Sequence, residues 1–304
     1  MLIRRSIQIA LLSLVLPASM AAEPLPQDAP EATEQEKQNL FDRVVSNQKK
    51  NEQALDLYER IERVETRKNA NDPVPASVKT FRVIPSGTGM DRIPVGPDGK
   101  PADVAEYRVD LERLEKALAL AVEDGRSQRA GLEKYAKKKK ERNELIDATR
   151  NAFLFKLVGR EARGDRMLTR YSMEPNPTFR PTSRFTGIFT KVHGFFWLDE
   201  ESGQLARIEG EVTDDFTVGL FLGKIYKGSH FMQERYEFFP GLWLASFSQY
   251  DFDGRKLFSG FSVHERAFYS NYRYIGPPSE ALGVIRRELA VADLGSAGST
   301  AADP

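Results

Sequence analysis

The sequence of 304 residues contains no cysteine, which excludes several kinds of protein at once. No disulfide can hold the fold together, so the packing of side chains has to do so. A thiol nucleophile is excluded for the same reason. Nor is there a cysteine that could carry a lipid anchor, so we expect a soluble protein.

Motifs of common enzymes are missing as well. The chain has no GxSxG motif before a helix and no glycine-rich phosphate loop. Its three histidines, His193, His230 and His264, stand singly in strand-like segments, without HxH, HxxH or HExxH spacing. A metal site would need all three to converge in the fold, together with carboxylates. We interpret them as ordinary strand residues, and expect no catalytic residue, no metal and no cofactor.

Neither sign of charge is in excess, since 44 basic residues balance 44 acidic ones. A neutral chain has no general attraction to nucleic acid. The run Lys137–Lys140 is the densest basic segment, but Glu133, Glu141 and Glu144 dilute it. We interpret the run as the solvated face of a helix, with contact to phosphates of lipid or nucleic acid as the alternative.

Long apolar runs are absent apart from one at the start of the chain. Arg4 and Arg5 precede an apolar segment from Ile7 to Leu16, and small residues follow it. This order predicts a cleaved signal peptide over residues 1–21. An uncleaved membrane anchor is the alternative, but the segment is much shorter than the roughly 20 residues of a spanning helix. We therefore expect export and no membrane span in the mature protein.

The next part of the chain divides into a linker and a helix. Residues 22–32 are rich in proline and predict a flexible linker. Thr33 and Glu36 form a capping box that starts a helix over residues 33–50. Its apolar residues recur at helical spacing, at Leu40, Phe41, Val44 and Val45. At the other end of the chain, residues 277–304 predict a flexible tail with at most one helical turn near Val284–Leu289.

A helical insertion is predicted over residues 103–150. Its first helix has apolar residues at steps of three or four, at Tyr107, Leu111, Leu114, Leu118 and Ala121. Gly125 ends this helix and Ser127 caps the next. We expect the two helices to pack as a hairpin onto a face of a sheet.

The remainder of the chain has the pattern of antiparallel strands. Segments 57–68, 77–87 and 90–96 predict three strands, although a helix is a rival for the first. Eight more follow between residues 152 and 275, joined mostly by short polar or glycine-containing turns, with 176–190 as the longest irregular connection. Asp251-Phe252-Asp253-Gly254-Arg255 predicts a hairpin turn, because the later glutamate of a calcium loop is missing.

This pattern predicts an α+β fold in a single domain over residues 33–276. A strongly curved antiparallel sheet of about eleven strands would form a half-open barrel, covered by the N-terminal helix and the helical hairpin. Residues 193–212 illustrate the sheet: two apolar-rich segments flank the turn 199–203, and charged residues alternate with apolar ones after it.

Aromatic residues crowd the second half of the chain, and several strands carry apolar side chains on both faces. One apolar face can pack on helices, while the other needs a second cover from the curled sheet or from a ligand. We predict an apolar cavity in which a ligand contacts Phe196, Leu198, Ile208, Val212, Phe221, Trp243, Phe247 and Phe261. The alternative is that all these side chains are core.

The order of elements resembles the LolA/LolB and RseB-like superfamily. The segments FLFKLVGREARGDRMLTRYSMEPNPTFRPTSR, HGFFWLDEESGQLARIEGEV and YKGSHFMQERYEFFPGLWLASFS are similar to exported bacterial proteins like those that sort outer-membrane lipoproteins. The resemblance spans residues 35–275, and its motifs are structural: Lys227-Gly228, Gly241-x-Trp243 and the strand with Arg207 and Glu209. It implies a periplasmic half-barrel closed by helices that binds acyl chains.

From the residues and the resemblance together, we expect a non-enzymatic periplasmic protein that holds a lipid or the acyl chains of a lipoprotein, with the sorting of outer-membrane lipoproteins as the role that the resemblance implies. Binding would rest on desolvation of the apolar chain, which contributes about 0.8 kcal/mol per buried CH₂. The alternative function is a protein-interaction or envelope-stress sensor module of RseB type. In that case the basic helix or the 176–190 connection would contact an envelope protein.

Overall fold

The structure is a computed structural model. It describes residues 34–123, 126, 128–183, 185–218, 223–256 and 259–299. The predicted signal peptide and linker, Thr33, Gly125 and Ser127 lie outside the described residues.

Helices form where apolar residues recur at helical spacing. They are α2 (Glu34–Ala54), α3 (Val104–Glu123), α4 (Arg129–Ala152) and α5 (Pro278–Ser299), with 3-10 helices η1 (Leu55–Leu57) and η2 (Thr186–Lys191). The predicted N-terminal helix and the helical insertion are thus confirmed. The 3-10 helix η2 corrects the prediction for 176–190, which is not irregular throughout.

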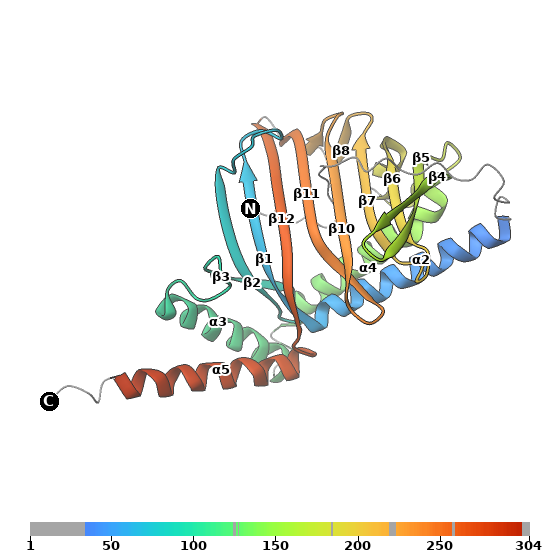
Figure 1. Ribbon diagram of the computed structural model, residues 1–304. Coiled ribbons are helices and arrows are strands. Elements are labelled where there is room, and N and C mark those ends of the chain that lie inside the picture. Colours follow the sequence, from blue (N-terminus) through green and yellow to red (C-terminus); the bar gives the residue numbers. More distant parts are fainter. Residues whose placement is uncertain are drawn as a thin grey trace. The chain divides into compact units, whose positions relative to one another are not determined.

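Among the described residues, twelve strands form an open antiparallel sheet, as the fold class predicted (Figure 1). The strands are β1 (Tyr58–Arg67), β2 (Ser77–Pro85), β3 (Met90–Val95), β4 (Phe153–Arg163), β5 (Arg166–Pro175), β6 (Val192–Asp199), β7 (Leu205–Val212), β8 (Phe216–Val218), β9 (Gly223–Ile225), β10 (His230–Phe239), β11 (Leu242–Lys256) and β12 (Ser259–Tyr274). Their order is β3-β2-β1-β12-β11-β10-β7-β6-β5-β4, and β9 joins β8 to β11.

The chain divides into two compact units, a division that the sequence did not predict. Unit 1 comprises Met1–Asn51, Glu65–Ser77 and Glu141–Phe268. Unit 2 comprises Glu52–Val64, Val78–Lys140 and Tyr269–Pro304. The boundaries 33–276 of a single domain therefore stay a prediction, and each unit is described by itself below.

Unit 2 has an aliphatic core between its strands and two helices. Buried side chains of α3 and α5 pack together with those of β2 and β3, namely Ile84, Ile93, Leu111, Leu114, Leu118, Ala281, Leu282 and Ile285. Within this unit Arg82 is buried, and it donates hydrogen bonds to Glu59, Tyr107 and Glu288. An arginine that is paired on several sides satisfies its own charge, so we assign these contacts to the stability of the unit.

Helix α5 corrects the prediction of a loose tail after residue 276. The segment from Pro278 is helical, and Ala281, Leu282 and Ile285 are buried against α3. Proline is favoured in the first turn of a helix, and the apolar positions face a partner that is distant in the sequence. Packing of this kind cannot be read from the tail alone.

Unit 1 contains the second core, on the face of the sheet that α2 covers. The strands of this unit are paired in the order β4-β5-β6-β7-β10-β11. Helix α2 lies along one face of them (Figure 1). The hairpin predicted at residues 193–212 is present as β6 and β7, with Gly203 at φ 65° in its turn. A positive φ of this size favours glycine, which explains why the turn has one.

Two predicted boundaries are wrong in unit 1. Residues 251–255 lie inside β11 and do not form a turn. Gly254 belongs there because the side chain of Phe261, opposite it on β12, would come within 2.8 Å of an added Cβ atom. In addition, residues 216–228, which the sequence predicts as one of the eight later strands, contain two short strands, β8 and β9.

Candidate apolar binding site

Helix α2 presents an aromatic side chain to the sheet of unit 1. The ring of Phe41 stacks on Phe155 of β4 at 4.6 Å between centroids. It also meets Tyr171 of β5 and Phe196 of β6 edge-on, at 5.9 and 6.1 Å. Phe196 and Tyr171 stack on each other at 5.1 Å. Aromatic contacts thus join α2 to three neighbouring strands.

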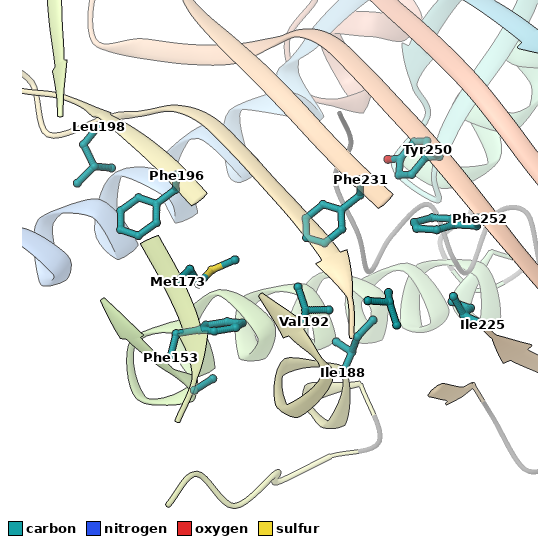
Figure 2. Packing of buried hydrophobic residues seen from close by; sticks show 12 residues of the cluster. Phe153, Met173, Ile188, Val192, Phe196, Leu198, Ile225, Phe231, Tyr250 and Phe252 are labelled. Atoms are coloured by element: carbon teal, nitrogen blue, oxygen red, sulfur yellow. The ribbon is translucent and has the colours of Figure 1, made fainter. Parts of the chain in front are cut away.

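This aromatic group continues into a larger buried cluster, which we call the apolar face. Figure 2 shows Phe196 and Leu198 near Met173 and Phe153, followed by further side chains of β6, β10 and β11. Its buried members are Ala152, Phe153, Met173, Ile188, Val192, Phe196, Leu198, Val212, Ile225, Phe231, Tyr250 and Phe252. Leu40, Phe41 and Val44 of α2 pack against it. The helix therefore covers part of this face with side chains that are themselves apolar.

A pair of glycines allows a close approach of side chains to the sheet on the apolar face. Gly194 and Gly210 are directly opposite each other on β6 and β7. A Cβ atom on Gly210 would lie 2.6 Å from the ring of Phe231 and 2.9 Å from Val192. Only a residue without a side chain allows this approach, so Gly210 sets how close Phe231 comes to the sheet.

Polar contacts fix the C-terminal half of α2 to the sheet. The amide of Asn51 donates to Gln204 Oε1 at 2.9 Å, and its carbonyl oxygen accepts from the backbone N–H of Trp243 at 3.2 Å. One turn earlier, Asn47 donates to the carbonyl oxygens of Ser202 and Gly203. The apolar residues of α2 lie before these two asparagines, in the part of the helix that packs by its apolar side chains.

Most of the predicted lining residues come together on this face. Phe196, Leu198 and Val212 are buried members of the cluster, and Ile208 and Phe261 pack against it. Phe221 lies outside the described residues. Whether these residues contact a ligand stays a prediction.

The structure places two predicted lining residues elsewhere. Trp243 packs with Trp197 in a separate small cluster, together with Leu168 and Ala206. Phe247 pairs with Glu234, and its ring is tilted against that of Phe268 at 5.0 Å between centroids. Since residues paired across strands share a face, Phe247 shares the face of Trp197 and not that of its neighbour Phe196. The sequence does not reveal this, because the face of the sheet on which a side chain lies depends on the register of its strand.

The opposite side of the unit 1 sheet, which we call the arginine face, has different chemistry. One row of paired residues crosses it from β4 to β10: Gly159, Arg170, Trp197, Arg207 and Glu234. The guanidinium of Arg170 lies 4.0 Å from the ring centroid of Phe195 and 5.0 Å from that of Trp197. These are cation–π distances, so arginines and rings form one layer here.

Carboxylates compensate most of the charge on the arginine face. Arg207 pairs with Glu209 at 2.8 Å and with Glu234 at 3.6 Å. Arg163 pairs with Glu234 at 3.2 Å, and its guanidinium lies 4.0 Å from the ring of Tyr236. Sequence reasoning identified the alternation of Arg207 and Glu209 but missed the contribution of Arg170, which depends on the pairing of β5 with β6.

One carboxylate at the β6–β7 turn has a shifted pKa. Burial raises the pKa of Asp199, but hydrogen bonds from the side chain and backbone of Ser202 and from Arg166 outweigh burial and leave the pKa below its ordinary value. Asp199 is therefore a charged, buried anchor of the hairpin.

All three histidines lie in one row of the arginine face. His193, Glu211, His230, Asp251 and His264 are paired in turn across five strands. His230 contacts Glu211 at 3.1 Å and His264 contacts Asp251 at 3.1 Å. Among the described residues, no group of three or more histidine and acidic side chains is placed to hold a metal ion. His193 and His230 share Glu211, at 3.9 and 3.1 Å, while His264 contacts Asp251.

The basic run lies on α4 within unit 2. Lys139 forms an ion pair with Asp56, and Lys137 and Lys140 are exposed. In the described part of the chain no helix combines the length and apolar character that a bilayer crossing requires.

Comparison with solved structures found similar chains, among them the following two. The first, described as an outer membrane lipoprotein-sorting protein domain from Vibrio parahaemolyticus, is 10% identical, covers 77% of this chain and 93% of its own, and has a TM-score of 0.28. The second, a DUF1329 family protein from Desulfovibrio piger, is 11% identical, covers 78% and 92%, and has a TM-score of 0.26. No protein-family model and no curated protein matches the sequence.

The description of the first structure names the same kind of protein as the resemblance found in the sequence segments. At these identities and TM-scores, neither likeness carries an argument about what this chain binds. The function is therefore argued from the residues of the site.

Proposed function

We propose that this protein is a non-enzymatic binding protein of the periplasm that holds a lipid, or the acyl chains of a lipoprotein, against the apolar face of unit 1. The observation that carries the proposal is the covering of this face by Leu40, Phe41 and Val44 of α2. An acyl chain that replaced these side chains would make the same kind of contact, and each buried CH₂ would contribute about 0.8 kcal/mol.

The contacts of α2 support this division of roles. Asn47 and Asn51 hold the C-terminal half of the helix by hydrogen bonds to the β6–β7 turn and to β11. The preceding part adds an ion pair between Asp42 and Arg150. Exposed ion pairs contribute at most about 1 kcal/mol. We infer that the first turns of α2, which are held by apolar contacts and this exposed pair, move from the sheet before the hydrogen-bonded last turns, which would open the apolar face to a ligand.

Titration of the full chain with a fluorescent fatty acid tests the proposal. Cis-parinaric acid should bind saturably at one molecule per chain. Phe41→Ala should strengthen binding severalfold, because it removes a ring that the acyl chain would have to displace from Phe155. Asn39→Ala changes an exposed residue of the same helix and should leave binding unchanged.

Two results would contradict the proposal. One is the absence of saturable binding by a chain that is folded by circular dichroism. The other is equal affinity of wild type and Phe41→Ala. In either case a stoichiometric protein in a periplasmic crosslinking experiment would favour the alternative, an interaction or sensor module.

A further inference from the structure

Strand β4, at one end of the strand order, has exposed apolar side chains. Within the described residues β4 ends the strand order and pairs with β5 on one side. Three of its apolar side chains are exposed: Leu154 at 55%, Leu157 at 44% and Val158 at 43%. An edge strand presents unpaired backbone N–H and C=O groups, and such a strand is a template for a further strand.

A basic position lies directly behind this edge. Arg170 of β5 is paired with Gly159 of β4. Since Gly159 has no side chain, nothing on β4 stands between the Arg170 guanidinium and a strand that would pair next to β4. The Arg170 Nε atom is buried and has no hydrogen-bond partner among the described residues. The neighbouring rings of Phe195 and Trp197 make cation–π contacts with the Arg170 guanidinium, but they do not neutralise its charge.

A second basic residue extends the same pattern along β4. Lys156 pairs with Ser172, and Ser172 pairs with Phe195, so the Lys156 side chain shares the arginine face. It is exposed, and the described residues place no carboxylate within ion-pair distance of it. The other arginines of β4 differ, since Arg160 pairs with Glu200 and Arg163 with Glu234.

We propose that β4 accepts an extended segment of another protein as an additional strand. An acidic side chain of that segment, opposite Gly159, faces Arg170 and Lys156. Apolar side chains flank it and pack beside Leu157 and Val158. Backbone hydrogen bonds supply affinity in this mode of recognition, and the side chains supply specificity.

A second copy of this chain fits the edge less well. The strand has three basic residues, Lys156, Arg160 and Arg163, and one acidic residue, Glu161. Pairing of two β4 strands brings like charges opposite one another, which destabilises a sheet. The charge of the edge therefore favours an acidic partner.

A phage-displayed library of random nonapeptides, selected on the full chain, tests this inference. Enriched peptides should carry one Asp or Glu flanked by apolar residues. Arg170→Gln should weaken a selected peptide at least tenfold, and Lys156→Glu should shift selection away from acidic residues. Val158 has no partner in the β5 register, so Val158→Pro should keep the fold and abolish binding.

Circular dichroism and thermal melting would show that each variant is folded. Absence of enriched peptides, enriched peptides without an acidic residue, or full binding by folded Val158→Pro would overturn the inference. A dimer in light scattering that Val158→Pro dissociates would also overturn it, since the occupant would then be a second copy. The variants in this experiment change only residues at or next to the β4 edge, so its outcome is independent of fatty-acid binding to the apolar face.

Discussion

The two faces of the unit 1 sheet are built from adjacent residues but by different physical means. Phe196 lies on the apolar face, among rings from α2, β4 and β5. Trp197, the next residue, lies on the arginine face between the guanidinium groups of Arg170 and Arg207. One face relies on a helix for cover, while the other is covered by its own long charged side chains. We propose ligand binding at the first face only.

The largest effect on stability is expected when the side chain of Phe196 or of Trp197 is truncated. Phe196→Ala and Trp197→Ala remove side chains that are only 5% and 3% exposed. Each should lower the free energy of unfolding by about 3–5 kcal/mol, because a large cavity forms. Only Phe196→Ala should weaken binding of cis-parinaric acid at least tenfold. Urea unfolding and fluorescence titration measure the two quantities.

Equal loss of fatty-acid affinity in both variants would remove the distinction between the faces. Titrations should be carried out at a temperature at which urea curves show both variants to be more than nine-tenths folded.

A smaller effect is expected from the hydrogen bonds that hold α2 on the apolar face. Asn51 is buried and contacts both Gln204 and the backbone of Trp243. Asn51→Ala leaves these buried groups without a partner and should cost about 1–3 kcal/mol. Asn47→Ala, which removes partly buried hydrogen bonds to Ser202 and Gly203, should cost less. Urea unfolding of the two variants would refute this order if Asn47→Ala were the more destabilised.

The smallest effect concerns pH and the hairpin that joins β6 to β7. The pKa of Asp199 is lower in the folded protein than its ordinary value. Its contribution to stability is therefore complete above the unfolded pKa of about 3.9 and is lost as the pH falls through the folded pKa. Asp199→Asn should cost about 1 kcal/mol at pH 7 and less at pH 3. Urea curves at both pH values measure this, and an equal cost at both would contradict it.

The fold was largely predictable where the pattern of the residues is local. Alternation in 204–212 predicts β7, and the spacing of Leu40, Phe41 and Val44 predicts α2. The turn that joins β6 to β7 follows from Gly203 and its acidic neighbours. These features depend on neighbours in the chain, which the sequence shows directly.

The candidate site was predictable only in part, because it depends on pairing between distant strands. Phe196, Ile208 and Val212 share the expected face, since β6 and β7 are one hairpin. Phe247 does not, because the register of β10 on β11 aligns it with Glu234. Arg170 could not be identified at all, since its ring contacts require β5 to lie beside β6. Register and bulges are not encoded in the spacing of one strand.

The central claim is that the apolar face of unit 1 holds an acyl chain, and native mass spectrometry tests it most directly. The full chain should be purified from the periplasm without detergent and analysed before and after extraction with organic solvent. We predict an added mass of one lipid or acylated molecule that collisional activation releases, and that is reduced in Phe196→Ala but retained in Trp197→Ala. A bare polypeptide mass in the wild-type protein, in repeated preparations, would contradict the claim.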